Sequence, residues 1–160
     1  MTIYSITMYS PIGILKLSSD EQLLKSISFD AEYIENDGEI PTVLIRAKNQ
    51  LDEYFSGCRH RFDLPTDPEG TEFQRSVWRH VAAVNYGTTK SYIDIAREVN
   101  SENSSRAIGM ANGRNPLPII IPCHRIIGQN GKLTGYAGGL ERKKWLLLHE
   151  LNNSVKRGLF

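Results

Sequence analysis

The amino-acid sequence predicts an α+β protein with a small N-terminal α/β lobe and a mainly helical C-terminal lobe that contains a helix-turn-helix. Apolar and polar residues alternate through much of 3–29, which is strand spacing, whereas apolar residues beyond residue 70 recur at helical spacing. Between these patterns the stretch 63–70 has the proline, glycine and aspartate content of a linker. We therefore place an N-terminal lobe with its linker at 1–70, a helical domain at 71–151 and a tail at 152–160.

The N-terminal lobe is expected to contain three short strands and one helix. Three segments have strand character, at 3–8, 14–17 and 23–29. The turn Pro11–Ile12–Gly13 separates the first two of them. Residues 43–55 have apolar side chains at helical spacing, and Gly57 ends that helix.

The C-terminal lobe is expected to be built from helices. Four segments have helical spacing, at 73–84, 91–99, 104–111 and about 140–151. Gly87 stops the first, and Ser91 followed by Asp94 resembles a capping box that opens the second. The second and third, with a short break at 100–103 between them, have the arrangement of a helix-turn-helix.

Charge and composition limit the classes of function. A chain of 160 residues with a formal net charge of +1 and 40% hydrophobic residues is neither disordered nor a strongly basic, histone-like DNA binder. Its charges are uneven, since 1–70 carries 6 Lys and Arg against 12 Asp and Glu, and 71–151 carries 11 against 6. A polyanion-binding lobe beside a non-binding lobe has this pattern, and chance clustering of solvated charges produces it too.

The sequence favours a cytoplasmic protein with reduced thiols. Two cysteines, Cys58 and Cys123, are too few for a disulfide framework, and the N-terminus has neither a basic leader nor a long apolar run. No stretch reaches the roughly 18 to 20 apolar residues that span a membrane. We therefore expect no role at a membrane.

The segment 119–128, IIIPCHRIIG, carries the most chemistry. Cys123 ends an apolar run beside a histidine and an arginine, and cationic neighbours favour the thiolate and its nucleophilicity. A cysteine next to a histidine more often only fills space in a core, so this pair does not decide the function by itself. Cys58, His60, Cys123 and His124 lack the paired spacing of a zinc site, and we expect no metal.

A series of short motifs extends the evidence beyond this segment. In order these motifs are RAIG at 106–109, NP at 115–116, PCHR at 122–125, GYAGGL at 135–140, WLL at 145–147 and HE at 149–150. In order and spacing the series resembles the methylated-DNA–protein-cysteine methyltransferases, the O6-alkylguanine-DNA alkyltransferases, from about Thr71 to Leu151. Residues 1–70 resemble more faintly the variable, ribonuclease H-like N-terminal lobe of that family. A cysteine-rich N-terminal segment is missing, which favours the stand-alone bacterial or archaeal members.

The resemblance implies a single-use reaction without a cofactor. Cys123 would accept the alkyl group irreversibly from O6-alkylguanine, or from O4-alkylthymine, in double-stranded DNA. His124 would remove the thiol proton through a water, and Glu150 would orient the imidazole. Tyr92 matches the family's donor to guanine N3, and Asn115 matches the asparagine that braces the turn carrying the cysteine. By pattern alone, Tyr92 is an ordinary core aromatic and Glu150 a solvated carboxylate.

The resemblance also implies how DNA is held. Chemistry on a base requires its extrusion from the stack. Arg106 matches the family's arginine that fills the gap left by the extruded nucleotide. A phosphate contact or a solvated charge is a competing role for this residue. A helix of small residues would enter the minor groove, while tight helix–helix packing explains small residues equally well. The predicted DNA-binding residues are Arg106, Ala107, Gly109, Met110, Ala111, Arg114 and Arg125.

A further set of residues would form the pocket for the extruded base. Tyr136 and the loop at Gly138 would close over the base, and the N–H of Ala137 would address its O6 atom. The carbonyls of Cys123 and Ile126 would accept from the 2-amino group. We expect the protein to act on DNA as a monomer.

Two other functions fit parts of the sequence. The first is a module that recognises alkylated DNA without repairing it, but proteins of that kind typically carry tryptophan in place of the acceptor, and Cys123 is present here. The second is a thiol hydrolase built on Cys123 and His124. It would need an oxyanion hole and a peptide groove, which the sequence does not locate, and a different spacing of cysteine and histidine.

Overall fold

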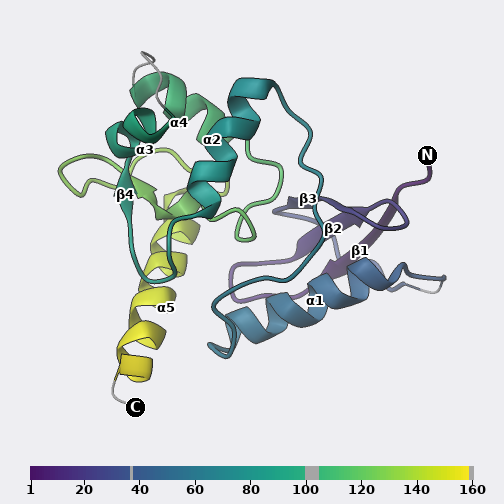
Figure 1. Cartoon of the computed structure of the whole chain (residues 1–160). Coiled ribbons are helices and arrows are strands. Elements are labelled where there is room, and N and C mark those ends of the chain that lie inside the picture. The colour runs from purple at the N-terminus through teal and green to yellow at the C-terminus, as the bar shows by residue number, and fades with distance from the viewer. Residues whose placement is uncertain (37, 100–104, 159–160) are drawn as a thin grey trace. The chain divides into compact units, whose positions relative to one another are not determined.

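The computed structural model describes residues 1–36, 38–99 and 105–158 (Figure 1). The chain divides into two units, Met1–Glu69 and Gly70–Phe160. The first unit contains a small antiparallel sheet and one helix, and the second consists mainly of helices. The predicted α+β class is confirmed.

The N-terminal unit has the three strands and the helix that the sequence predicts. Strands β1 (Tyr4–Met8), β2 (Leu15–Ser19) and β3 (Leu24–Ser28) form a sheet in the order β1-β2-β3, with both pairs antiparallel. Helix α1 (Thr42–Phe55) packs against this sheet (Figure 1). Gly13, in the turn between β1 and β2, has a φ of 109° that suits glycine.

Alternation in the strands builds the core of this unit. Leu15, Leu17 and Leu24 are fully buried, as are Leu51 and Tyr54 of α1, the helix that contacts strands β2 and β3. Each buried leucine stabilises the unit by about 1.5–3 kcal/mol. The core therefore follows directly from the strand and helix periodicities of the sequence.

The described residues of the C-terminal unit form five helical segments and two very short strands. In chain order they are α2 (Glu72–Ala82), β4 (Lys90–Ser91), α3 (Tyr92–Glu98), α4 (Ser105–Gly113), the 3-10 turn η1 (Cys123–Arg125), β5 (Ile126–Ile127) and α5 (Leu140–Gly158). Both α2 and α3 begin with a capping box, formed by Thr71 with Gln74 and by Ser91 with Asp94. The capping box predicted at Ser91 is confirmed.

Pairing of β4 with β5 positions the functional region. The two strands are parallel, with Lys90 opposite Ile126 and Ser91 opposite Ile127. Because Tyr92 follows Ser91 directly, this pairing holds the first residue of α3 beside the segment that follows η1.

Helices α3 and α4 pack against each other and against α2, as expected for a helix-turn-helix (Figure 1). The Nε1 group of Trp78 in α2 donates to the carbonyl of Ala111 in α4 at 2.8 Å. The predicted break at 100–103 and the predicted start of the following helix at Ser104 lie outside the described residues.

Helix α5 is longer than the sequence analysis predicts. It continues as one helix from Leu140 to Gly158, so the predicted end near Leu151 is wrong (Figure 1). The segment after Leu151 is polar but contains no proline, and its first glycine is Gly158. Polarity is a weak signal for a helix end, because an exposed helical turn needs no apolar residues.

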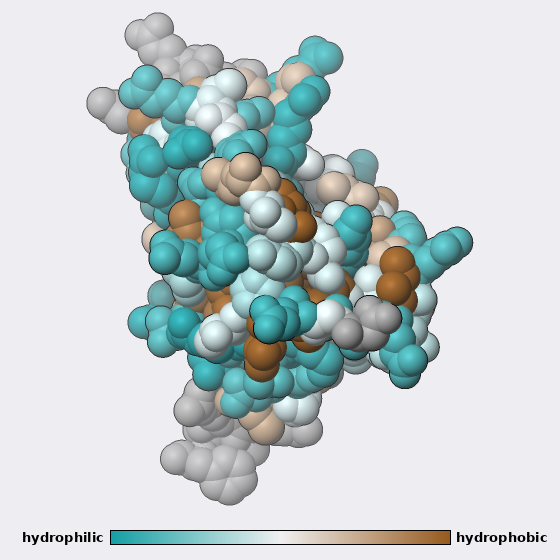
Figure 2. Space-filling model, turned by 90° about the vertical axis from the view of Figure 1, so that its right-hand side faces the viewer, coloured by the Kyte–Doolittle hydropathy of each residue, from teal (hydrophilic) through white to brown (hydrophobic). Residues whose placement is uncertain are grey.

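The face of the molecule drawn in Figure 2 is largely hydrophilic, and apolar residues are scattered over it. None of the helices that the structure describes has the length and apolar character that crossing a membrane requires.

Candidate active site

The turn that carries Cys123 is fixed by the side chain of Asn115. Asn115 Nδ2 donates to the carbonyl of Ile121 at 2.8 Å, and the N–H of Leu117 donates to Asn115 Oδ1 at 2.9 Å. Inside the turn, Ile119 has a φ of 75°, a left-handed conformation that costs a β-branched residue about 1–3 kcal/mol. The surrounding hydrogen bonds therefore hold a turn that the local sequence alone does not favour.

The thiol of Cys123 lies at the start of η1 and is only 5% exposed. Burial raises its pKa to about 11, and a hydrogen bond with Asn115 and the charge of Lys143 offset only part of that rise. A cationic neighbour thus favours the thiolate, as expected, but desolvation outweighs it, and the resting sulfur is a thiol. The thiol needs a base before it can act as a nucleophile.

A buried imidazole and a buried carboxylate follow Cys123 in the structure. His124 Nε2 lies 2.6 Å from Glu150 Oε2, and both residues are at most 1% exposed. Burial lowers the pKa of His124, against the opposing effect of Glu150, so the imidazole is neutral at pH 7. Its Nδ1 atom has no hydrogen-bond partner within the described part of the chain. With Nε2 bonded to the carboxylate, Nδ1 is the ring atom that can accept a proton.

Arg125 belongs to this buried network. Its Nε donates to Glu150 Oε1 at 2.8 Å, its Nη2 to Oε2 at 3.0 Å and its Nη1 to the Val84 carbonyl at 2.7 Å. Burial by itself raises the pKa of Glu150, but hydrogen bonds from His124 and Arg125 hold that pKa well below its usual value. The predicted contact of Arg125 with DNA is thus corrected. The residue is only 6% exposed, and its donors are occupied by Glu150 and Val84.

Two backbone carbonyls near the thiol already accept hydrogen bonds from side chains. Asn112 Nδ2 donates to the carbonyl of Cys123 at 3.1 Å, and Lys143 Nζ donates to the carbonyl of Ile126 at 2.6 Å. A carbonyl oxygen has two lone pairs, and the Cys123 carbonyl also accepts from the N–H of Ile126. Both lone pairs of Cys123 are therefore used in this structure, so its predicted contact with an amino group would have to displace one of these donors.

A pocket of about 550 Å³ lies in the same unit, within the range of about 300–1,000 Å³ that is common for small-ligand sites. It brings together six of the predicted residues: Tyr92, Arg106, Gly109, Met110, Tyr136 and Ala137. The Tyr92 hydroxyl donates to the carbonyl of Thr134, another lining residue, at 3.1 Å. Burial and the neighbouring Cys123 raise the pKa of Tyr136 well above its usual value. Tyr136 therefore connects the pocket to the thiol.

The glycine-rich loop at 135–139 forms one side of this pocket. Gly135 and Gly139 have φ values of 40° and 90°, which other residues rarely adopt. Ala137 is exposed, whereas Gly138 is buried and its carbonyl accepts from Arg142 Nη1 at 3.0 Å. The two glycine conformations and the bond from Arg142 to the Gly138 carbonyl therefore fix the backbone of this loop.

Helix α4 presents the other predicted DNA-binding residues to different degrees. On the helix Arg106 and Met110 are exposed and Ala107 and Gly109 are half-buried, and Arg114, the residue that follows the helix, is exposed. Ala111 is only 3% exposed, and its carbonyl accepts from Trp78 of α2. It nevertheless lines a second pocket, of about 280 Å³, together with Ala107, Met110 and Arg114, so its place on the binding face stays a prediction.

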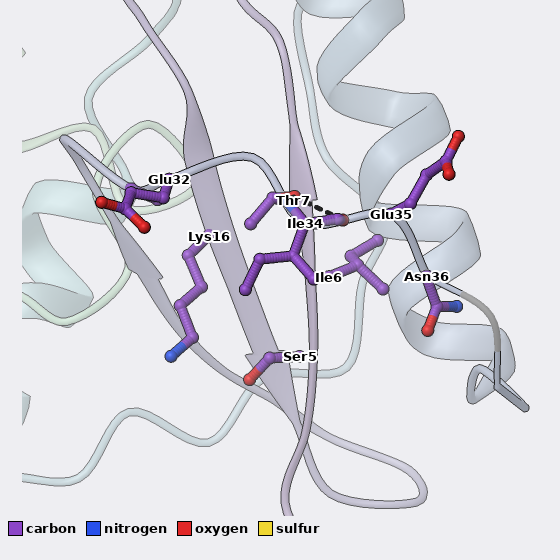
Figure 3. A pocket seen from close by; sticks show the side chains of 9 residues that line it. Ser5, Ile6, Thr7, Lys16, Glu32, Ile34, Glu35 and Asn36 are labelled. Atoms are coloured by element: carbon purple, nitrogen blue, oxygen red, sulfur yellow. Dashed lines mark hydrogen bonds between the residues drawn. The ribbon is translucent and has the colours of Figure 1, made fainter.

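The N-terminal unit has a pocket of its own, about 410 Å³ in volume, between β1, β2 and the segment 31–36 (Figure 3). Across it the Thr7 hydroxyl donates to the Ile34 carbonyl at 3.0 Å and accepts from the Ile34 N–H at 2.9 Å. Its lining residues include no cysteine or histidine. In the described parts of both units, no three His, Cys, Asp or Glu side chains are grouped so that they could hold a metal ion.

Sequence analysis missed two buried polar residues of the site, Asn112 and Lys143. Asn112 lies on α4 in a segment that looks solvent-facing, and nothing local indicates its bond to Cys123. Lys143 does have a signal, since it shares one helical face with Leu146 and Glu150 at spacings of three and seven residues. A lysine on the buried face of a helix is unusual, and this spacing could have identified it.

Comparisons with known proteins cover both units. Residues 72–152 match the family described as "6-O-methylguanine DNA methyltransferase, DNA binding domain", and residues 3–68 match "6-O-methylguanine DNA methyltransferase, ribonuclease-like domain". The chain is 46% identical to the methylated-DNA–protein-cysteine methyltransferase of Methanosarcina barkeri over 153 residues, 90% of this chain and 94% of that protein. It is 41% identical to the constitutive methylated-DNA–protein-cysteine methyltransferase of Bacillus subtilis over 154 residues, 91% and 93% of the two chains.

Solved structures agree with these sequence relatives. The crystal structure of Mycobacterium tuberculosis O6-methylguanine methyltransferase matches with a TM-score of 0.85 and 39% identity, over 95% of this chain and 94% of that chain. The structure of Mycobacterium tuberculosis OGT in complex with DNA also has a TM-score of 0.85, with 40% identity and 93% of each chain covered.

Proposed function

This chain belongs to the methylated-DNA–protein-cysteine methyltransferase family, and on that premise we propose that it repairs DNA by moving an alkyl group from O6 of guanine to its own Cys123. The reaction is irreversible, so each molecule acts once. The observation that carries this proposal is the buried thiol of Cys123 beside the His124–Glu150 pair, with a pocket next to it.

The buried network suits a proton transfer that precedes nucleophilic attack. His124 Nδ1 takes the thiol proton through a bridging water while Nε2 keeps its bond to the Glu150 carboxylate. The sulfur then attacks the alkyl carbon, the S–C bond forms, and the C–O6 bond breaks with its electron pair moving to the guanine. The Tyr92 hydroxyl supplies a proton at N3 of the leaving base. These reaction steps need no cofactor, because the protein itself keeps the alkyl group.

The exposed side of α4 suits the delivery of the base. Arg106 and Met110 line the pocket from this helix, opposite the loop of Tyr136 and Ala137. A guanine must leave the stack to reach a buried sulfur, and Arg106 fills the gap that it leaves. The pocket would hold the base between Tyr136 and α4, with the Ala137 N–H toward O6.

Mass spectrometry after exposure to a damaged duplex tests this function. Incubation with a duplex that carries one O6-methylguanine should add one methyl group per protein molecule, and peptide mapping should find it on Cys123. A Cys58→Ala variant should react like the wild type, whereas Cys123→Ala should not react but should still bind the duplex, because phosphate contacts dominate affinity.

Other outcomes would point to other functions. An unchanged mass together with tight, damage-dependent binding would make the protein a recognition module. Hydrolysis of peptide or thioester probes that depends on Cys123, without methylation, would favour the thiol hydrolase. An O4-methylthymine duplex in the same assay would show whether that lesion is a second substrate.

We propose that the protein works as a monomer in the cytoplasm. Both cysteines are free thiols, and a reducing compartment keeps an acceptor sulfur in that state. Light scattering of the protein, alone and with a short duplex, would reveal any dimer.

A further inference from the structure

Lys143 is a buried cation that the mechanism above does not use. It lies on the inner face of α5 with 0% of the residue exposed. Its Nζ donates to the carbonyls of Ile126 at 2.6 Å and of Thr134 at 2.8 Å. Among the described residues no carboxylate lies within ion-pair distance of this ammonium. A buried charge without a counter-ion is costly, so the position calls for an explanation beyond packing.

The ammonium and the Tyr92 hydroxyl share one acceptor. Tyr92 donates to the Thr134 carbonyl at 3.1 Å, and the same oxygen accepts from Lys143. Lys143 Nζ also lies 5.8 Å from the centre of the Tyr92 ring. Thr134 and Tyr92 both line the pocket proposed for the base. The cation is therefore placed beside the proton donor of the proposed reaction.

In the resting structure the Tyr92 proton is committed to a backbone carbonyl. To donate to an incoming purine, the hydroxyl has to leave Thr134. A base that fills the pocket would keep water from the Thr134 carbonyl, and a carbonyl without water or another donor is destabilised. Because Lys143 continues to donate to Thr134, that oxygen stays satisfied after the hydroxyl turns away. The positive charge also favours the negative charge that Tyr92 develops once it has given up its proton.

We propose that Lys143 is a positioning residue of the alkyl-transfer site, a cation that holds the Thr134 carbonyl and releases the Tyr92 hydroxyl to the extruded base. This inference rests on the proposed function. The competing explanation is a purely structural one, in which Lys143 only ties the loop of Thr134 to the segment of Ile126.

Single-turnover transfer from a methylated duplex separates the two explanations. Lys143→Met removes the charge and both hydrogen bonds, and Lys143→Gln retains an uncharged donor. Lys144→Met is the matched control, because Lys144 is the next residue of α5 and is exposed. The rate at saturating duplex, the half-saturating concentration and the melting temperature are measured for each protein.

We expect both Lys143 variants to lower the saturating rate about tenfold or more, with little change in the half-saturating concentration. Lys144→Met should stay within about twofold of the wild type. In a Tyr92→Phe background, Lys143→Met should cause little further loss, because the two residues act in one step. Full activity of Lys143→Gln, or independent losses that multiply in the double variant, would overturn the inference in favour of a structural tie.

A pH series supplies a readout that a structural tie would not move. Burial lowers the pKa of Lys143 to about 8, against the opposing effect of the Cys123 sulfur. Its surroundings also contain Tyr92 from α3 and His124 from η1. The ratio of the wild-type rate to the Lys143→Met rate should shrink toward one above this pH, and a constant ratio would contradict a cationic role.

Failure of the proposed function and failure of the proposed role of Lys143 give different results. If wild-type protein leaves Cys123 unmodified, the proposed function fails. If wild-type protein transfers the methyl group and Lys143→Met does so equally fast, only the role of Lys143 fails. If Lys143→Met does not fold, the less disruptive Lys143→Gln variant and its pH series decide.

Discussion

Replacing Arg125 by methionine removes the guanidinium that binds both oxygens of the Glu150 carboxylate. The change deletes charge-assisted hydrogen bonds of 2.8 and 3.0 Å to Glu150 and one of 2.7 Å to the Val84 carbonyl. With the guanidinium gone, Glu150 remains as a buried anion that keeps its bonds to His124 and to the Gly87 N–H but has lost its cationic partner. Breaking a buried pair in this way costs about 3–5 kcal/mol.

Protonation of His124 would offset part of this loss of stability, but it would also slow the reaction. The charge of Arg125 lowers the pKa of His124, whereas the bond to Glu150 raises it, so loss of the guanidinium raises the pKa of His124. A protonated His124 can no longer accept the proton of Cys123. We therefore expect a loss of stability of at least about 2 kcal/mol together with slower methyl transfer below neutral pH.

Urea unfolding followed by tryptophan fluorescence measures this loss. Trp78 and Trp145, the only tryptophans of the chain, both lie in the unit that contains Arg125. Arg114→Met is the matched control, since Arg114 is exposed, and it should change the free energy of unfolding by less than about 0.5 kcal/mol. If Arg125→Met unfolds at the wild-type urea concentration, the buried network does not hold the fold in the way argued above.

Three other changes test further parts of the structure. His124 and Glu150 have pKa values below those of the unfolded chain, so the unfolded state binds more protons. The free energy of unfolding, measured in urea, should therefore fall as the pH drops below about 6.5 and fall further below about 4.5. The fall should be less steep in Glu150→Gln, and a free energy that does not change with pH would contradict this. Gly87→Ala should destabilise the protein by about 2–4 kcal/mol, because φ is +75° and a Cβ there would lie against Ser154 Oγ. Ser154→Gly in the same chain should restore part of the lost stability, and no restoration would exclude a clash with Ser154 as the cause. Arg106→Ala should slow transfer from a duplex about tenfold or more but hardly affect transfer from free O6-benzylguanine, and equal slowing would remove its role in base extrusion.

Much of the fold could be predicted because its signals are local. The alternation around Leu15 and Leu17 determines which side of the sheet is buried, and Ser91 with Asp94 caps α3 through neighbouring backbone groups. Periodicity and capping depend on residues only a few positions apart. The end of α5 was missed for the same reason, since the polar segment after Leu151 contains neither a proline nor an early glycine.

Within the site, burial is what the sequence could not determine. Arg125 has the residue type of a phosphate contact, but its location is decided by Glu150, 25 positions away, and by Val84, 41 positions away. Likewise, the thiol pKa of Cys123 depends on how completely other segments cover it. Such long-range partners leave no local pattern, so residue type alone could show neither the burial of the thiol nor the partners of Arg125.

Helix α4 has two sides with different roles, because Asn112 on its inner side donates a hydrogen bond to the carbonyl of Cys123. Its inner edge is joined to the reactive turn, so a shift of this helix would also displace the sulfur. Its outer edge, with Arg106 and Met110, is exposed. If the outer edge contacts DNA as proposed, substitutions there can change affinity for DNA while the reactivity that depends on the inner edge stays constant.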